Sequence, residues 1–407
     1  MKILQFCNKP PFPPADGGAI AMGSMTRCLV HNGFEVTVLS MVSHKHRSQA
    51  DDWPQDLRKR VRLLFAEVDL RVKKHAAFLN LFSSESYHAQ RFHTATVARS
   101  LQALLHDEVF DVIQMETIYP MVYHALIRRL SDAPITLRLH NIEHEVWLTT
   151  AANDPVFYRR MYLRLLAERL KTFELKAISQ AEGILAISSA DLDKISHLIQ
   201  VPAETIPLGM DITHYAPAMD FAHPPRLFHL GAMDWIPNQI GLRWFLDKVW
   251  PRLRARFPAL ELHLAGRKMP AAFFGYKSPG LIIHGEVGDA VEFMRSKDIM
   301  IVPLLSGSGL RVKIIEGMLL GKVVVSTSVG ASGIHYKDGE NILIANNEDE
   351  FVRKISDCIN RPDFLKHIGR NACSIAREEY ALERVSMRLG KFYERLTGGC
   401  NEVRATV

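Results

Sequence analysis

A short segment in the last third of the chain combines a flexible backbone with charged side chains. Gly307 and Gly309 allow a tight loop whose backbone can approach a ligand closely. Arg311 and Lys313 follow in the expected first turn of a helix, where the helix dipole disfavours cations unless an anion is bound. One turn further on, Glu316 could accept two hydrogen bonds from the diol of a ribose or a sugar. This spacing favours a phosphate site, although a helix on a sheet with solvated charges has the same pattern.

A buried strand and an amphipathic helix are expected to position that segment. Residues 299–303 are apolar and predict a parallel strand, and residues 310–320 carry apolar side chains at helical spacing. Gly321 would end the helix, and residues 322–326 predict the next strand. A strand, a loop of small residues and a helix N-terminus together form a typical phosphate-binding site, because the free backbone N–H groups of the helix can bind the anion.

A histidine marks a second candidate group. Residues 135–140 (ITLRLH) predict a strand that ends at His140. Because α/β domains bind ligands at the carboxyl ends of their strands, His140 could orient a sugar hydroxyl or stabilise developing charge. A lone histidine is more often structural, so the two interpretations stay open. His144 and Glu145 follow, but no third residue has the spacing of a zinc ligand, and we expect no metal site.

The first 40 residues have the rhythm of a parallel α/β domain. They predict in turn a strand, a proline-rich loop, a helix and a second strand, at residues 3–7, 8–18, 19–32 and 35–40. This order gives a right-handed unit with the loop at the ligand-binding edge of the sheet. Gly17 and Gly18 let the backbone approach a ligand there, but no third glycine completes a dinucleotide-binding fingerprint.

The composition is that of a globular protein with anionic partners. With 407 residues the chain is too long for one compact core, so two domains are expected. No run reaches the roughly 18 apolar residues of a membrane-spanning helix. Five cysteines, odd in number and without metal-site spacing, suit a reducing cytoplasm. A net charge of +6 favours nucleotide phosphates or lipid headgroups, and nucleic acid is not expected because no recognition motif accompanies the charge.

A proline-rich segment without periodicity, residues 207–225, marks the expected domain boundary. We place the first domain at residues 1–210 and the second at residues 211–379, where the strand and helix rhythm restarts. A loop at residues 231–238 follows the first strand of the second domain. A C-terminal helix at about residues 380–398 is expected to pack back on the first domain, and the polar tail after it is expected to be loose.

Basic and aromatic residues gather between residues 58 and 92. The basic residues are Arg58, Lys59, Arg60, Arg62, Arg71, Lys73 and Lys74, and the apolar ones are Phe78, Leu79, Leu81, Phe82, Tyr87 and Phe92. Such a surface could dock on an anionic membrane or bind a lipid-linked substrate. A solvated face beside ordinary core residues explains the pattern equally well.

With these motifs in order, the chain resembles the GT-B glycosyltransferases. The tandem α/β layout is similar to their two Rossmann-like domains facing across a cleft, and residues 309–318 (GLRVKIIEGM) resemble the donor-binding helix of family 4 glycosyltransferases. Further similar segments are Pro13-Pro14-x-x-Gly17-Gly18, Arg138-x-His140-Asn141-x-Glu143, Gly231 to Asn238, and Gly321 with the following Val-Val-Ser-Thr. The resemblance covers nearly the whole chain in matching order.

The resemblance implies a retaining glycosyltransferase that uses a nucleotide-activated sugar without a metal or a cofactor. The acceptor would be a glycan, a lipid-linked sugar or a similar molecule in polysaccharide or glycoconjugate synthesis, at the cytoplasmic face of a membrane. Glu316 would hold the ribose, the Gly17–Gly18 loop would face the diphosphate, and His140 would touch a hydroxyl of the donor sugar. The residues expected to bind the donor are Gly17, Gly18, Asp234, Asn238, Arg267, Glu286, Val287, Ser308, Gly309, Leu310 and Glu316, and those expected to be catalytic are His140, Arg311 and Lys313.

Two departures from the family pattern shape this expectation. The family's first glutamate, eight positions before the second, falls on Ser308, which can donate a hydrogen bond but cannot act as a carboxylate. The family's Gly-Arg…Lys phosphate clamp is absent after Gly231. Because the leaving nucleoside diphosphate gains negative charge, we expect Arg311 and Lys313, with Arg267, to replace that clamp. A nucleotide-sugar epimerase of the same fold and a non-catalytic partner subunit remain the alternatives.

Overall fold

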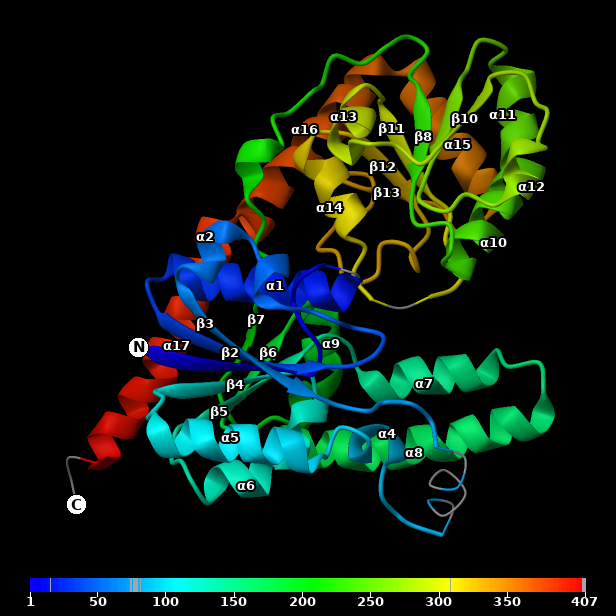
Figure 1. The fold of residues 1–407 in the computed structure, drawn as a ribbon. Coiled ribbons are helices and arrows are strands. Elements are labelled where there is room, and N and C mark those ends of the chain that lie inside the picture. Colours follow the sequence, from blue (N-terminus) through cyan, green and yellow to red (C-terminus); the bar gives the residue numbers. More distant parts are fainter. Residues whose placement is uncertain (15, 74, 76–79, 81, 308, 405–407) are drawn as a thin grey trace. The chain divides into compact units, whose positions relative to one another are not determined.

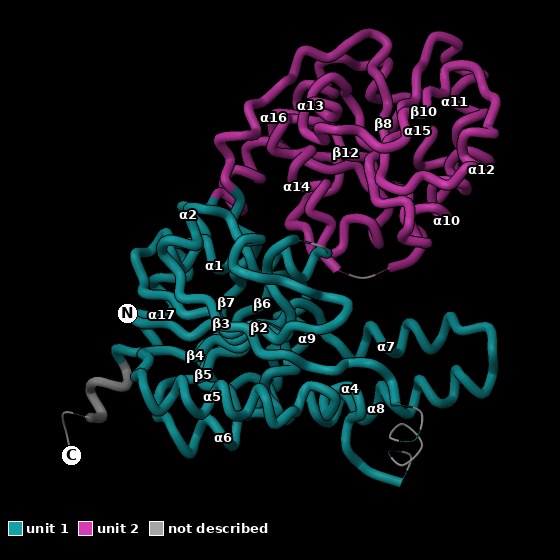
Figure 2. Tube along the Cα trace, viewed as in Figure 1, with its two compact units in different colours: residues 1–210, 382–407 teal, residues 211–381 magenta. Residues whose placement is uncertain are grey.

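The chain folds into two compact units, each built on its own sheet (Figures 1 and 2). The computed structural model describes all residues except 15, 74, 76–79, 81, 308 and 405–407, with side chains as far as residue 398. Unit 1 comprises Met1–Met210 and Leu382–Val407, and unit 2 comprises Asp211–Ala381. The first crossing of the chain between them thus falls after residue 210, where the sequence places the domain boundary. Unit 2 ends two residues beyond the expected 379.

Unit 1 has a parallel sheet with the strand order β3-β2-β1-β4-β5-β6-β7 in its described part. The strands are β1 (Lys2–Cys7), β2 (Glu35–Val42), β3 (Val61–Glu67), β4 (Val112–Glu116), β5 (Ile135–Leu139), β6 (Gly183–Ala186) and β7 (Ala203–Thr205). They are short and largely apolar, as expected of parallel strands that are buried on both faces. β1 lies between β2 and β4, with Phe6 in register with Leu39 and Met115.

Helices cover both faces of this sheet (Figure 1). The α-helices are α1 (Gly17–His31), α2 (Gln55–Arg58), α4 (Tyr87–Gln90), α5 (Ala95–Asp107), α6 (His124–Arg128), α7 (Glu143–Ala152), α8 (Phe157–Gln180), α9 (Ser189–Ile195) and α17 (Leu382–Arg404). Short 3₁₀ turns occur at Ala50–Asp52, Tyr119–Tyr123 and Ser196–Leu198. Asp16, Ser86 and Thr94 cap α1, α4 and α5, because their side chains accept hydrogen bonds from free N–H groups in the first turns of these helices.

The C-terminal helix α17 packs on unit 1, as the sequence predicts. Leu389 and Phe392 share a buried cluster with Cys28 and Leu29 of α1. The prediction of a loose tail after about residue 398 is wrong up to residue 404, because α17 continues to Arg404. The glycine pair at residues 398 and 399 disfavours a helix, but the segment holds no proline, so the backbone hydrogen bonds of the helix can continue through it.

Unit 2 has a second parallel sheet, with the strand order β10-β9-β8-β11-β12-β13. The strands are β8 (Leu227–Leu230), β9 (Leu262–Ala265), β10 (Leu281–Gly285), β11 (Ile299–Val302), β12 (Val323–Ser326) and β13 (Leu343–Ile344). The helices are α10 (Ile236–Trp244), α11 (Trp250–Arg256), α12 (Ala271–Phe274), α13 (Ala290–Arg295), α14 (Val312–Leu319), α15 (Glu348–Asn360) and α16 (Pro362–Tyr380), with a 3₁₀ turn at Ile212–His214. Two Rossmann-like α/β units are therefore present, as expected.

Three helix boundaries differ from the sequence prediction. The expected loop at 231–238 is shorter, because α10 already begins at Ile236. A π-helical turn at Phe245–Val249 separates α10 from α11, where Pro251 has no N–H to continue the α-helical pattern. Helix α14 begins at Val312 rather than at residue 310, and helix α1 begins at Gly17 rather than at residue 19.

Candidate functional site

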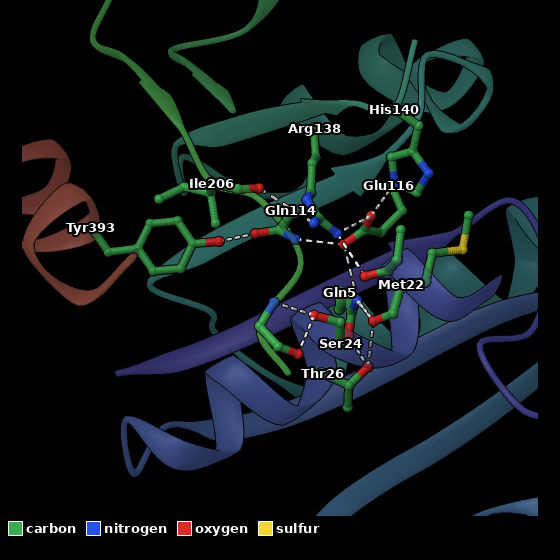
Figure 3. A network of polar contacts seen from close by, with 12 residues as sticks. Gln5, Met22, Ser24, Thr26, Gln114, Glu116, Arg138, His140, Ile206 and Tyr393 are labelled. Atoms are coloured by element: carbon green, nitrogen blue, oxygen red, sulfur yellow. Dashed lines mark hydrogen bonds and ion pairs between the residues drawn. The ribbon is translucent and has the colours of Figure 1, made fainter. Parts of the chain in front are cut away.

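His140 lies at the carboxyl end of β5 and contacts a buried carboxylate on the neighbouring strand. Its Nε2 is 2.8 Å from Oε2 of Glu116, the last residue of β4 (Figure 3). The Glu116 side chain is completely buried and the His140 side chain is 6% exposed. A buried carboxylate stays ionised only if several groups donate hydrogen bonds to it, so the neighbours of Glu116 decide whether its side chain is charged.

Three further side chains donate hydrogen bonds to Glu116 (Figure 3). Gln5 Nε2 and Gln114 Nε2 lie 3.0 and 2.6 Å from Oε1, and Arg138 Nη1 lies 3.4 Å from Oε2. Burial alone would raise the pKa of Glu116, but Arg138 and the hydrogen bonds from His140 and Gln5 outweigh it and lower the pKa. Glu116 is therefore ionised at neutral pH.

The ionised carboxylate fixes the tautomer of His140. Burial lowers the pKa of His140 despite the opposing effect of Glu116, so its imidazole is neutral at neutral pH. A carboxylate only accepts hydrogen bonds, and the single ring proton must therefore sit on Nε2. Within the described part of the chain, no residue contacts Nδ1 by a hydrogen bond. The second nitrogen is thus an acceptor, suited to a hydroxyl group.

The same network ties the site to two helices. Arg138 Nη1 donates to the carbonyl of Ala21 at 2.8 Å, and Gln5 Nε2 donates to the carbonyl of Met22 at 3.1 Å, both in α1. On the other side, the hydroxyl of Tyr393 in α17 donates to Gln114 Oε1 (Figure 3). The returning C-terminal helix therefore contacts the polar cluster beneath His140.

The Gly17–Gly18 pair opens helix α1 beside a second ion pair. Asp16 caps the helix by accepting from Ala19 N at 2.9 Å, and its carboxylate accepts from Lys9 Nζ at 2.6 Å. A Cβ on Gly18 would lie 2.7 Å from Lys9 Nζ, whereas a Cβ on Gly17 would meet open space. A side chain at position 18 would displace the Lys9 ammonium, and with glycine there the N–H groups at the start of α1 lie beside a cation.

In unit 2, three glycines place the ends of adjacent strands side by side. Gly231 N donates to the carbonyl of Ala265, and Gly266 N donates to the carbonyl of Gly285 at 2.7 Å. A Cβ on Gly266 would lie 1.9 Å from the Gly231 carbonyl, so only glycine fits there. The segments that hold Asn238, Arg267 and the Glu286–Val287 turn consequently start from one edge of the sheet.

Lys313 points toward this edge. Its Nζ is 3.5 Å from Asn238 Oδ1, and a Cβ on Gly231 would lie 3.0 Å from it. Burial, with a contribution from Arg311, lowers the pKa of Lys313 to about 7. Burial and the nearby Lys313 likewise lower the pKa of the fully buried His229 on β8 to about 3. Lys313 is thus a desolvated amine above a neutral imidazole, and an anion bound beside it would favour its charged form.

Arg311 is held by an aromatic ring and by the loop before it. Its guanidinium carbon lies 4.9 Å from the centre of the Trp235 ring, and its Nη1 donates to the Gly309 carbonyl. Gly307 and Gly309 have φ values of +118° and +87°, and a Cβ on Gly307 would lie 2.8 Å from Trp235. Arg311 is the N-cap residue of α14, so the glycine loop extends to residue 311. The expected position of Arg311 inside the first turn is therefore wrong by one residue.

Glu316 has a partner that the sequence did not suggest. The hydroxyl of Tyr215 donates to Glu316 Oε1 at 2.9 Å. Burial raises the pKa of Glu316, and the Tyr215 hydrogen bond opposes that effect. Tyr215 follows the turn at Ile212–His214, and its carbonyl accepts from Arg377 of α16 at 2.8 Å. The carboxylate on α14 is therefore oriented by the segment that begins unit 2.

The remaining expected donor residues lie farther out on the surface. Asp234 pairs with Lys268 at 3.1 Å and with Arg267 at 3.8 Å, and all three side chains are more than one-third exposed. Glu286 is exposed, and Val287 and Leu310 are partly buried. Ser308 lies outside the described residues. The structure thus brings Asn238, Gly309, Arg311 and Lys313 together, whereas Arg267 is bound to Asp234.

The described basic and aromatic residues at positions 58–92 are divided between the surface and the core, and Phe82 stays 81% exposed. Tyr87 and Phe92 are buried, and Arg58, Arg62 and Arg71 pair with the carboxylates of Asp51, Glu108 and Asp69. Lys74, Phe78, Leu79 and Leu81 lie outside the described residues. Two aromatic side chains of the run are therefore part of the core, and three of its arginines form ion pairs with acidic side chains.

No group of three or more histidine, cysteine, aspartate or glutamate residues in the described part of the chain is arranged to hold a metal ion. His144 and Glu145 have other partners. His144 Nδ1 lies 2.5 Å from Glu174 Oε2, and Glu145 pairs with Lys194 at 2.5 Å.

Three residues important to these sites were missed by reasoning from the sequence. Glu116, Tyr215 and Trp235 hold His140, Glu316 and Arg311 respectively. For Glu116 a signal existed, because Gln114 and Glu116 alternate in an otherwise apolar strand and so lie on one face. For Tyr215, in an irregular segment, the sequence contains no comparable pattern.

Comparison with known families places both units in one group of enzymes. A family model described as Glycosyltransferase Family 4 matches residues 15–214, and one described as Glycosyl transferases group 1 matches residues 224–361. The two matches follow one another along the chain and correspond to the two units.

Relatives and solved structures agree with that match. The chain is 26% identical to an uncharacterized 44.6 kDa protein in the cps region of Klebsiella pneumoniae, over 68% of this chain and 72% of that protein. It is 23% identical to a phosphatidyl-myo-inositol mannosyltransferase of Mycobacterium tuberculosis, over 77% of this chain and 81% of the relative. Its fold is similar to that of Anabaena HepE in complex with UDP-glucose, with a TM-score of 0.61 and 16% sequence identity. The match covers 98% of this chain and 100% of the HepE chain.

Proposed function

The chain belongs to the group 1 glycosyltransferases of family 4, with the GT-B fold, and we propose that it is a retaining enzyme that transfers a sugar from a nucleoside diphosphate donor to a glycan or lipid-linked acceptor. The observation that carries this proposal is the meeting of Lys313, Arg311 and Asn238 at the glycine-lined edge of the second sheet. Two fixed cations beside a close backbone approach suit a diphosphate.

The nucleotide is proposed to extend from this edge toward Glu316. The Glu316 carboxylate keeps Oε2 for the ribose hydroxyls while Tyr215 occupies Oε1. The backbone after Gly285, at Glu286 and Val287, would contact the base. The complex of HepE with UDP-glucose supports a nucleotide sugar as the donor, because a protein of the same fold holds that ligand.

The two cations would act on the leaving group. In the proposed reaction the bond between the anomeric carbon and the diphosphate oxygen breaks, and a new bond forms from that carbon to the acceptor oxygen on the same face. The acceptor proton passes to the departing diphosphate, so no side-chain base is required. Arg311 and Lys313 stabilise the charge that develops, and each such contact is worth about 2.7–4 kcal/mol of barrier by analogy with oxyanion sites. This charge stabilisation makes a metal unnecessary in our proposal.

His140 is proposed to bind a hydroxyl of the donor sugar. Its Nδ1 is the acceptor nitrogen, and Glu116 holds the opposite nitrogen in place. A hydroxyl fixed near the anomeric carbon orients the sugar for attack. The relative named as a mannosyltransferase and the relative from a cps region support an acceptor in glycoconjugate or polysaccharide synthesis.

The test is release of nucleoside diphosphate from a panel of UDP- and GDP-linked sugars, measured with EDTA present. We expect turnover by the wild type and a loss of about 10²–10³-fold in Lys313→Ala and in Glu316→Ala. Matched controls are Lys366→Ala and Glu378→Ala, exposed residues of α16 that should leave turnover unchanged. Proton NMR of the transferred sugar should show a retained anomeric configuration.

Three outcomes would contradict this proposal. Interconversion of the donor sugars without an acceptor would indicate an epimerase. An absence of turnover with every donor, together with a stable protein complex on pull-down, would indicate a non-catalytic subunit. Turnover that EDTA abolishes and a divalent cation restores would overturn the metal-independent mechanism.

A further inference from the structure

Helices α7 and α8 form an antiparallel hairpin in unit 1 whose connecting turn lies at residues 153–156 (Figure 1). The first turns of α8 expose large apolar side chains. The exposed fractions are 72% for Phe157, 74% for Tyr158, 54% for Met161 and 39% for Leu165. Single exposed apolar residues are ordinary on protein surfaces, but four within nine residues of one helix require an explanation.

These four side chains share one side of α8. Phe157, Met161 and Leu165 follow one another at intervals of four residues, and Tyr158 lies next to that row. The opposite side of the helix already packs into unit 1, where Leu166, Leu170 and Ala177 are buried. The apolar row is therefore additional to the face that holds α8 on the domain.

The charge beside the first two turns of the row is positive. Arg160 and Arg164 are exposed and lie one turn apart along its edge, Arg159 is exposed on the other side of the helix, and the exposed Glu168 follows one turn after Arg164. Asp154 is the one acidic residue between positions 154 and 165 of the sequence, and it lies 3.5 Å from Arg159. An apolar row flanked by arginines suits a lipid surface that carries negative headgroups.

We propose that the first turns of α8, residues 157–165, dock this protein on an anionic lipid bilayer, with the apolar row at the acyl boundary and the arginines among the headgroups. Among the described residues no helix is long and apolar enough to cross a membrane. A second copy fits this surface less well, because a symmetric contact would bring like-charged arginines together. The proposal does not depend on the sugar-transfer reaction.

The test is flotation of the full chain with vesicles made of phosphatidylglycerol and phosphatidylcholine in equal amounts. The wild type should float with these vesicles and stay at the bottom with vesicles of phosphatidylcholine alone. The triple variant Phe157→Ser, Tyr158→Ser, Met161→Ser should lose at least about tenfold in partitioning, because three large apolar side chains no longer enter the bilayer. The double variant Arg160→Gln, Arg164→Gln should lose binding to a similar extent, and added salt should weaken the wild type.

Matched controls come from exposed residues elsewhere. Val109→Ser removes an 88% exposed apolar side chain, and Arg353→Gln with Arg370→Gln removes two exposed charges from unit 2. Both controls should float like the wild type, and thermal unfolding should show that every variant is folded. Flotation of the triple variant at the wild-type level would overturn the proposal. So would light scattering that shows a dimer of the wild type that the same substitutions dissociate.

Discussion

Glu116 Oε2 accepts a hydrogen bond of 2.8 Å from Nε2 of His140, across the carboxyl ends of two adjacent strands. The contact makes Glu116 the residue that decides which nitrogen of the imidazole carries the proton. Arg138, on β5 two residues before His140, keeps the carboxylate ionised from the other side. The hydrogen bonding available to His140 therefore depends on an ion pair whose two side chains are completely buried.

Replacement of Glu116 should separate the positioning of His140 from the stability of the fold. In Glu116→Gln the buried Arg138 loses its carboxylate, and we expect the free energy of unfolding to fall by about 3–5 kcal/mol. Sugar transfer should fall at least about tenfold, because the amide can accept or donate and no longer dictates the tautomer. Denaturant unfolding and nucleotide release measure the two effects.

The double variant Glu116→Gln, Arg138→Met provides the control. Removal of the orphaned cation should restore a large part of the stability without restoring transfer. Recovery of both together would mean that Glu116 acts on activity only through folding.

Tyr215 is expected to assist nucleotide binding through Glu316. In Tyr215→Phe the carboxylate loses a hydrogen bond, and we expect the nucleotide Kd to rise about threefold to tenfold, which corresponds to about 1 kcal/mol. Tyr215 lowers the pKa of Glu316, so its removal raises that pKa further. If the ribose requires the ionised carboxylate, as proposed, loss of binding on acidification should begin at a higher pH in Tyr215→Phe.

Calorimetric titration with UDP and GDP across acidic pH measures this shift. In Glu316→Gln the same acid limb should disappear, because the amide does not titrate. An acid limb at the same pH in Tyr215→Phe and in the wild type would contradict the proposed role.

The sequence predicts the fold well because each element has a local signal. The apolar runs of β1 and β11, the break at Gly321 and the irregular segment at 207–225 all depend on neighbours in the chain. The loop before α14 could also be predicted from the sequence, since Gly307 and Gly309 favour a backbone conformation that other residues avoid. These features require no knowledge of which strands become neighbours.

Contacts between distant segments could not be predicted in this way. Gln5 meets Glu116 only because β1 lies next to β4, and Tyr215 meets Glu316 across 101 positions of the sequence. The partners of the basic residues at 58–92 could not be predicted for the same reason. Arg62 pairs with Glu108, which follows α5 in the sequence. Phe92 is buried in a cluster that contains residues of other strands and helices. The local sequence pattern shows which residues are polar or charged. It does not show which distant residue forms a hydrogen bond or an ion pair with each of them.

Arg311 should matter far more than Arg267 for the diphosphate. Arg267 is about half exposed and pairs with Asp234, so Arg267→Ala should change turnover less than about threefold. Arg311→Ala should lower it about 10²–10³-fold, and Arg311→Lys should recover only part, because lysine keeps the charge but loses the stacking on Trp235. Steady-state nucleotide release compares the three, and equal losses in Arg267→Ala and Arg311→Ala would contradict this assignment.

The amine of Lys313 should make donor binding depend on pH. Burial and Arg311 lower the pKa of Lys313 to about 7, so above that pH the free protein holds a neutral amine. If the diphosphate requires the ammonium form, binding takes up a proton, and the Kd should rise by up to about tenfold per pH unit above 7. In Lys313→Arg the guanidinium stays charged, and the Kd should change little over the same range. Lys366→Ala should follow the wild type. A flat wild-type profile, or an equally steep one in Lys313→Arg, would show that Lys313 does not bind the diphosphate as a titrating cation.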